Sequence, residues 1–283
     1  MIKVDEMNYK LYTDKIKFAD INTLFALSVL ERKVEGQVYA DKKENSASIY
    51  IRHPYGMSLL YGESENEKFY DWFLTYLLNK NQDRKHYEWL QVYPMFLANK
   101  IDAILNNNLI EYNPDQNVNT LMNFEEKIIK YMRINFCFNV DKYMDFKEKH
   151  RFMKSDEIIV KTNEEIFHKL KGSVIPKYFW DKSDDFVNSG IGFTLLKGNN
   201  TPVSTAFSSV VIENKIEIGI ETLNEYQGCG YATLVCMKLI DYCLEAGYEP
   251  VWSCNASNLG SKILAEKLGF VEQKRIPYYR LPR

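Results

Sequence analysis

Residues 226–233 read YQGCGYAT, with two glycines one residue apart. A strand-like run, IEIGIET at 216–222, precedes them, and a helix-like run begins at Tyr231. Glycine accepts positive φ angles and lets a ligand approach the backbone closely. The first amide groups of a helix lack intrahelical partners and carry partial positive charge. The stretch therefore predicts a site where backbone N–H groups bind an anion, and phosphate in particular.

The spacing within this loop separates three kinds of phosphate-binding loop. A Walker loop requires Gly-Lys-Ser/Thr, which does not occur here. A dinucleotide-binding loop requires Gly or Ala where Thr233 stands, and parallel β-α-β units where these strands read as antiparallel hairpins. The third kind, Gln/Arg-x-x-Gly-x-Gly/Ala, fits 227–232 at every required place.

Composition and charge narrow the class of protein. The 283 residues are 46% hydrophobic with a formal net charge of −2, so no global field favours nucleic acid or an anionic membrane. We find no apolar span long enough to cross a bilayer and no signal-peptide core in the first ten residues. Five cysteines without a C-x-x-C pair, and four scattered histidines, favour reduced thiols and no metal site. We therefore expect a cytoplasmic protein.

The order of predicted elements indicates an α+β protein in two halves. The first half reads as a hairpin, helix, short strand, helix and strand at 47–62, 65–80, 88–93, 94–108 and 131–140. The second half reads as three strands between 191 and 222, a helix, a strand, a helix and a strand at 231–247, 250–254, 257–269 and 270–276. A charged, apolar-poor stretch at about 145–155 predicts a boundary between domains 1–150 and 151–283.

The two halves share a grammar of elements but little residue identity. Hairpin, loop, helix, short strand, helix and strand occur twice, offset by roughly 160 residues. This pattern fits a duplicated α+β unit, and two unrelated α+β domains remain the alternative.

From 216–222 through the loop to Glu266-Lys267-Leu268-Gly269-Phe270, the chain resembles the GNAT superfamily of N-acetyltransferases. The resemblance covers roughly residues 155 to 283 and rests on an ordered set of elements rather than on one motif. It implies a mixed, mostly antiparallel, splayed sheet flanked by helices, and acetyl-CoA as the cofactor. The sequences GIET, PVW and AEKLGF, with the extra N-terminal half, look like a bacterial two-domain branch of the superfamily.

The resemblance also implies where coenzyme A lies. Strands 216–222 and 250–254 are expected to splay apart and to admit the pantetheine arm, while the loop amides hold the diphosphate. The implied cofactor-binding residues are Thr222, Gln227, Gly228, Cys229, Gly230, Tyr231, Ala232, Thr233, Asn255, Asn258 and Ser261. For Asn258, capping of the following helix is an equally weighted alternative.

Transfer of an acetyl group to an amine requires removal of a proton. A lysine-like amine has a pKa near 10.4, so its deprotonation at pH 7 costs about 4.6 kcal/mol, and a general base must help. Glu217 and Glu221 share a strand face, and Glu221 is favoured because it is nearer the gap; the alternative for both is a solvated sheet residue.

One position departs from the family. Many GNAT enzymes place a tyrosine, the acid for the leaving thiolate, where this chain has Ala265. Tyr278, Tyr279, Cys254 or water could take that role. A covalent route through Cys254 is disfavoured because no histidine lies near it in the sequence.

The matching loop of the first half, YGESENEKF at 61–69, has one glycine and three glutamates. These glutamates would repel a diphosphate, so the first half, if it is a degenerate GNAT-like copy, has lost the cofactor. We expect it to wall the acceptor pocket or to mediate association, for example in a homodimer.

Two functions of different class follow. The first is acetyl-CoA-dependent transfer of an acetyl group to the primary amine of a small molecule by direct attack on the thioester. The second is a non-catalytic sensor or scaffold that binds CoA or acetyl-CoA, and the missing tyrosine lends it weight.

Overall fold

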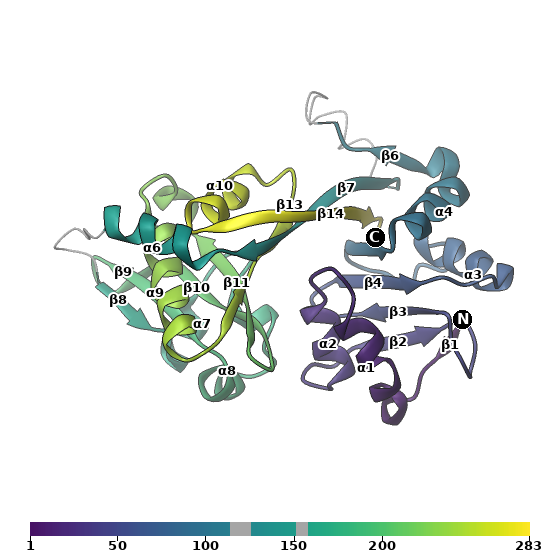
Figure 1. Ribbon diagram of the computed structural model, residues 1–283, viewed down its shortest axis with the longest axis horizontal. Helices are drawn as coiled ribbons and strands as arrows, with labels where there is room; N and C mark the ends of the chain where they lie inside the picture. Colours follow the sequence, from purple (N-terminus) through teal and green to yellow (C-terminus); the bar gives the residue numbers. More distant parts are fainter. Residues whose placement is uncertain (114–125, 151–157) are drawn as a thin grey trace. The chain divides into compact units, whose positions relative to one another are not determined.

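The computed structural model describes residues 1–113, 126–150 and 158–283, which form two compact units (Figure 1). Unit 1 comprises Met1–Asn135, Cys254–Asn258 and Lys274–Arg283, and unit 2 comprises Phe136–Ser253 and Leu259–Gln273. The domains 1–150 and 151–283 stay a prediction. Part of their expected boundary, at 151–157, lies outside the described residues.

Unit 1 contains a sheet with helices packed on it. Its helices are α1 (Lys10–Lys17), α2 (Leu24–Leu30), α3 (Glu67–Leu77) and α4 (Met95–Leu105). Its strands are β1 (Ile2–Lys3), β2 (Gln37–Ala40), β3 (Ser48–Arg52), β4 (Met57–Gly62), β5 (Glu88–Tyr93) and β6 (Leu109–Glu111). β2, β3 and β4 pair antiparallel. β4 and β5 pair parallel, and α3 connects them along the chain.

The core of unit 1 follows from the spacing of apolar residues. Phe69, Phe73 and Leu77 recur every four residues along α3, so they lie on one face of the helix, and all three are buried. They pack with Leu90 and Val92 of β5 in a single hydrophobic cluster. The hairpin, helix, strand and helix predicted for the first half are present as β3 and β4, α3, β5 and α4.

Unit 2 holds a second sheet, in the order β12-β11-β10-β9-β8. Its strands are β8 (Ile158–Lys161), β9 (Gly192–Lys197), β10 (Thr201–Ile212), β11 (Lys215–Thr222) and β12 (Glu249–Val251). Its helices are α6 (Val140–Lys149), α7 (Glu164–Lys169), α8 (Ser183–Ser189), α9 (Tyr231–Glu245) and α10 (Leu259–Lys267). α9 packs against β9, β10, β11 and β12 (Figure 1). The predicted α+β class is confirmed.

Three strands are divided between the two units: β7 (Ile128–Phe138), β13 (Ser253–Asn255) and β14 (Phe270–Leu281). The larger sheet runs β1-β2-β3-β4-β5-β14-β7-β13, with β6 beside β7. β14 is longer than the predicted strand 270–276, and its last residues pair antiparallel with β5. Pro277 lies within it, a residue that normally argues against a strand, so tertiary pairing overrides the local signal here.

The end of the chain is fastened to unit 1. Arg84, which is 3% exposed, donates from Nε to the carbonyl oxygen of Pro282 at 2.6 Å. The same guanidinium donates to the carbonyl oxygens of Tyr76 and Leu77 at the end of α3, where helix carbonyls lack intrahelical partners. Arg84 therefore satisfies the helix end and holds the C-terminal strand with one group.

No helix in the described parts of the chain combines the length and the apolar character needed to cross a membrane.

A buried carboxylate joins two turns of unit 1. Asp41 accepts hydrogen bonds from the hydroxyls of Ser46 and Ser64 at 2.7 and 2.6 Å, and from the backbone N–H groups of Ala47 and Ser48. Burial alone would raise the pKa of Asp41, but these hydrogen bonds outweigh it and hold the pKa below its usual value. The ionised form of Asp41 therefore stabilises the fold.

We expect Asp41→Asn to lower the free energy of unfolding by about 1–3 kcal/mol, because two buried hydroxyls and two amides lose an ionised acceptor. Since the folded pKa is lowered, the contribution is present above the ordinary aspartate pKa and is lost as the pH falls through the folded value. Urea unfolding at pH 7 and pH 3 measures both effects. The exposed Glu44→Gln is the control, and an unchanged midpoint in Asp41→Asn at pH 7 would contradict the assignment.

Candidate active site

The parallel strands β11 and β12 of unit 2 separate after three paired positions. β11 pairs with β12 over three positions only, the last of them Glu217 with Val251. After Val251 the chain leaves this sheet, and β13 joins the other sheet beside β7. The predicted single strand 250–254 is therefore wrong: it is two short strands interrupted at Trp252. The consequence is that β11 from Ile218 to Thr222 keeps β10 on one side and has no strand partner on the other in the described chain.

The loop after β11 has the backbone shape that its glycines allow. Gly228 and Gly230 have φ angles of +77° and +85°, which side-chain-bearing residues rarely adopt. A Cβ atom added at either glycine would meet no heavy atom within 4 Å. The glycines therefore serve the turn and leave open space in front of α9, rather than making room for the protein's own packing.

The backbone amides of this loop are arranged as in an anion-binding site. Gly230 is the N-cap of α9 and offers no side chain to cap it. Within the described residues, no N–H group from Gly228 to Thr233 donates to a protein acceptor. Because unpaired helix N-terminal amides attract negative charge, the arrangement fits a phosphate group.

Gln227 and Thr222 hold the loop against the strand. Gln227 Nε2 donates to the carbonyl oxygen of Thr222 at 3.3 Å and to Asn224 Oδ1 at 3.1 Å. The Thr222 hydroxyl lies 2.8 Å from that of Ser204 on β10. Tyr231, the first residue of α9, is 3% exposed, so its ring is buried.

The two candidate bases have different environments. Glu217 is 7% exposed and sits at the last paired position before the strands separate. Ser253, just beyond β12, donates its hydroxyl to Glu217 Oε1 at 2.9 Å. Glu217 pairs with Val210 of β10, directly beside a bulge between Ser208 and Val210.

Glu221 lies nearer the end of β11 and is already engaged. Its Oε2 accepts from the backbone N–H groups of Ser173 and Val174, each at 2.7 Å, and from the Ser173 hydroxyl at 3.2 Å. Gly172 packs so closely that a Cβ there would lie 2.5 Å from the Glu221 side chain. Glu221 thus fixes the turn between α7 and the 3-10 helix Pro176–Tyr178.

The other implied cofactor residues make local hydrogen bonds. Asn255 Oδ1 accepts from the N–H and the hydroxyl of Ser257, both at 3.0 Å. Asn258 N–H donates to the carbonyl oxygen of Asn255, and Ser261 accepts from Trp252 Nε1 at 3.1 Å. The cofactor roles of all three, and the alternative that Asn258 caps α10, stay predictions.

Comparison with known proteins agrees with this geometry. Residues 16–279 match the family described as GNAT acetyltransferase. This chain belongs to the GNAT acetyltransferase family. The match spans both units, so the extra N-terminal half is part of the family pattern and not an unrelated addition.

Relatives extend the comparison. An uncharacterised N-acetyltransferase of Bacillus subtilis strain 168, YdfB, is 26% identical over 90% of this chain and 92% of its own length. A GCN5-related N-acetyltransferase-like protein of Streptococcus suis 89/1591 has a TM-score of 0.70 at 17% identity and covers 98% of this chain and all of its own. A tandem GNAT protein from the clavulanic acid biosynthesis pathway has a TM-score of 0.58 at 9% identity, over 99% and 97% of the two chains. At these identities the structural likenesses show the fold alone.

As a GNAT N-acetyltransferase, this chain is an acyltransferase, and the family uses acetyl-CoA as acetyl donor. The residues fit such a group: the open glycines and unpaired amides would hold a diphosphate, and the free edge of β11 could pair with an amide-containing arm as an added strand does.

The position of the family's tyrosine acid offers no proton here. Ala265 is fully buried in α10. The Tyr279 hydroxyl donates to Asp102 Oδ1 at 2.7 Å in unit 1, and burial together with Asp102 raises its pKa well above the usual value. Tyr278 stacks on Trp89, and Cys254 is buried. The Tyr279 hydroxyl is thus engaged with Asp102, and Tyr278, Cys254 and water as the acid stay predictions.

Unit 1 repeats the order of elements but keeps its strands closed. β4 and β5 pair over five positions from Met57–Trp89 to Tyr61–Tyr93, so no gap opens between them. In the loop before α3, Ser64 donates its hydroxyl to Asp41 at 2.6 Å, so a carboxylate of the chain lies against this loop.

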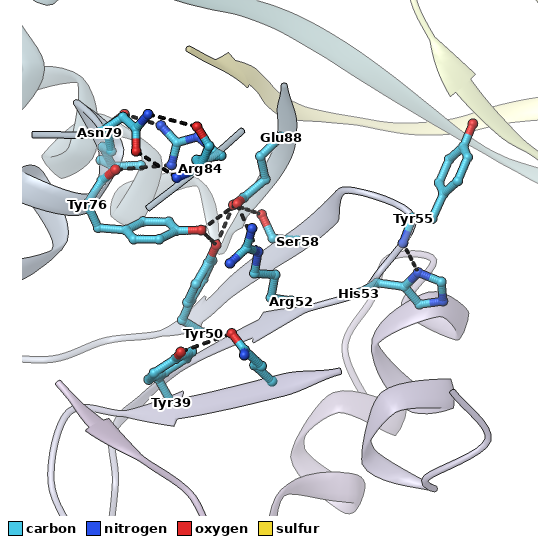
Figure 2. Close-up of polar contacts among 12 residues, drawn as sticks. Tyr39, Tyr50, Arg52, His53, Tyr55, Ser58, Tyr76, Asn79, Arg84 and Glu88 are labelled. Carbon is cyan, nitrogen blue, oxygen red and sulfur yellow. Dashed lines mark hydrogen bonds and ion pairs between the residues drawn. The ribbon is translucent and has the colours of Figure 1, made fainter. Parts of the chain in front are cut away.

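A buried network reinforces this closed pair. Figure 2 shows the Glu88 cluster, made of Tyr50, Arg52, Ser58, Tyr76 and Glu88. Glu88 of β5 is 1% exposed and accepts from Ser58 of β4 at 2.6 Å, while Tyr50, Tyr76 and Arg52 also bind its carboxylate. A paired and hydrogen-bonded buried carboxylate of this kind ties β3, β4, β5 and α3 together.

The histidines and cysteines carry no metal signature. Over the described residues, His, Cys, Asp and Glu form no group of three that could hold a metal ion. His53 is buried, which lowers its pKa to about 4, and its Nδ1 accepts from the N–H of Tyr55 at 3.1 Å (Figure 2). His53 is therefore neutral and structural at pH 7.

Sequence reasoning missed three features beside the site: Ser253, the turn 172–174 and Lys197. Ser253 follows Val251 by two residues, and this period-2 spacing was the one signal that could have found it. The role of Gly172 follows from its contact with Glu221, 49 residues further along the chain, so no local pattern could have revealed it.

We expect Gly230→Ala to fold but to lose acetyl-CoA affinity by about tenfold or more, because its Cβ would enter the space in front of the loop amides. Gly247→Ala is a matched control. Gly247 also has a positive φ, +77°, and no atom within 4 Å of an added Cβ, so the backbone strain is alike, about 1 kcal/mol, while the position is at the far end of α9. Calorimetric titration with acetyl-CoA measures the difference. Equal affinities of the two variants would show that the loop does not hold the cofactor.

Proposed function

We propose that this chain transfers the acetyl group of acetyl-CoA to the primary amine of a small molecule, with Glu217 as general base. The observation that carries the proposal is the buried Glu217 carboxylate at the point where β11 and β12 separate. Glu221, favoured by sequence, is a poorer candidate because three donors of the turn 173–174 already occupy one of its oxygens.

Glu217 has the chemistry that the reaction requires. At pH 7 an ammonium acceptor must lose a proton at a cost of about 4.6 kcal/mol, and a positioned carboxylate lowers that barrier. The hydroxyl of Ser253 fixes the orientation of the Glu217 carboxylate. Because Glu217 is 7% exposed, an acceptor that reaches it must be slender, which suits a primary amine.

The remaining steps of the reaction need a donor to the oxyanion and a proton for the leaving thiolate, and we assign these roles to β11 amides and to water. Acetyl-CoA, when bound, supplies an acetyl thioester that the neutral amine can attack directly. Backbone N–H groups of β11 between Ile218 and Thr222 are candidates to donate to the developing oxyanion. A thiol has a pKa near 8.5, so its thiolate is a fair leaving group, and water can protonate it. On this account Ala265 is tolerated.

The cofactor site is proposed to comprise Thr222, the loop 227–233, and Asn255, Asn258 and Ser261. For the loop, the open φ-positive glycines and the unpaired amides support the assignment. The closed β4/β5 pair supports one such site per chain. We propose that unit 1 serves the acceptor side or association.

One relative has a named acceptor. One partial relative, 33% identical over 30% of this chain, is the ribosomal protein bS18-alanine N-acetyltransferase of Haemophilus influenzae. That match covers too little of the chain to transfer its acceptor. The screen for acceptors should therefore pair small amines with a peptide that begins with alanine, with release of free thiol as the readout.

A CoA-binding sensor or scaffold without catalysis is the second candidate, favoured by Ala265 alone. The same screen separates the two. Thiol release that depends on an amine supports the enzyme, and tight binding without turnover on any amine supports the sensor.

With the amine found by that screen, we expect Glu217→Gln to lower kcat/KM by about 10²–10⁴-fold while the affinity for acetyl-CoA stays unchanged. Glu221→Gln keeps an oxygen that can accept from the turn 173–174, so its loss should be smaller. Initial rates of thiol release measure both variants. Full activity in Glu217→Gln would exclude it as the base.

We expect one molecule of acetyl-CoA to bind per chain, since β4 and β5 leave no gap and Asp41 occupies the unit 1 loop. The stoichiometry from calorimetric titration tests this directly. A value near two would mean that unit 1 retains a cofactor site.

A further inference from the structure

Lys197 stands at the end of β9, on the face that α9 covers. Side chains two residues apart share a strand face, so Lys197 lies on the same face as Phe193. The Phe193 ring lies 6.3 Å from that of Tyr242 on α9. Lys197 is therefore directed toward the helix, at the end of the sheet from which α9 begins.

The Lys197 ammonium is held at the first residue of α9. Its Nζ donates to the hydroxyl of Tyr231 and lies 5.0 Å from the centroid of the Tyr231 ring. Tyr231 is 3% exposed and directly follows Gly230, so its position is fixed by packing and by the loop. The positive charge is thus anchored beside the N-terminal turn of α9.

A cation is the wrong charge for this end of a helix. The macrodipole puts partial positive charge at the N-terminus, where a lysine is unfavourable. Residues 223–233 contain one carboxylate, that of Glu225, and 226–233 contain none. The helix N-terminal amides and the ammonium held on Tyr231 both favour negative charge, so an anion with more than one negative charge that contacts both gains from each of them.

We propose that Lys197, positioned by Tyr231, binds a phosphate group of coenzyme A. Lysine acts toward phosphate as a point charge, and an ammonium anchored on a tyrosine loses less freedom when the anion arrives. This inference rests on the proposed function, because it takes the loop 227–233 as the diphosphate site. It adds a side-chain cation from a different strand to a site that the sequence motif builds from backbone alone.

The test is calorimetric titration of the full chain with coenzyme A. We expect Lys197→Met to weaken binding about five- to tenfold, Lys197→Arg to keep most of the affinity, and Tyr231→Phe to lose less than Lys197→Met because the ring remains. Lys238→Met is the matched control, since it removes the same charge from an exposed position two turns further along α9. Binding by wild type should also fall more steeply with salt than binding by Lys197→Met.

Two ligands identify the phosphate. An equal loss with dephospho-coenzyme A assigns Lys197 to the diphosphate, whereas a loss that disappears with this ligand assigns it to the ribose 3′-phosphate. Unchanged coenzyme A affinity in Lys197→Met, an equal loss in Lys238→Met, or an equal loss for phosphate-free pantetheine would overturn the inference. Thermal unfolding of each variant identifies any that fail to fold, and Lys197→Arg then decides. If wild type binds no coenzyme A, the proposed function itself has failed.

Discussion

The separation of β11 from β12 after Glu217 is the constraint on which the site depends. A strand edge leaves backbone N–H and C=O groups without partners, and proteins seldom leave such groups unsatisfied. From Ile218 onward β11 keeps β10 on one side and has no strand on the other among the described residues, so this edge is open to a partner. Glu217 lies at the last paired position before the separation, and β11 continues from there to the glycine loop. The proposed base and the proposed anion site therefore lie at the two ends of the same unpaired stretch of β11.

Unit 1 shows what the fold does without that interruption. It has the same sequence of strand, helix, parallel strand and helix, yet Ser58 and Glu88 bridge β4 and β5 across their first positions. The loop before α3 binds a carboxylate of the chain itself, since Ser64 donates to Asp41. The two units therefore differ in the pairing of their parallel strands and in a few polar contacts, while the order of their elements is shared.

The glycine loop and the long helices were predictable because their signals are local. Gly228 and Gly230 require positive φ, and α3 follows from apolar residues at every fourth place. The break at Trp252, the extension of β14 past Pro277 and the turn that binds Glu221 depend on contacts between distant residues, so no local pattern reveals them. For the same reason the sequence favoured Glu221 by its place along the strand and had no measure of what already occupies its carboxylate.

The return of the last strand to unit 1 has a consequence for how the chain is made. β14 pairs with β5, and Arg84 donates a hydrogen bond to the carbonyl oxygen of Pro282, 198 residues further along the chain. A ribosome delivers the N-terminal sheet long before it delivers this partner, so β5 waits with an open edge while unit 2 is synthesised. During that interval the unpaired edge of β5 is a place where a wrong strand can pair.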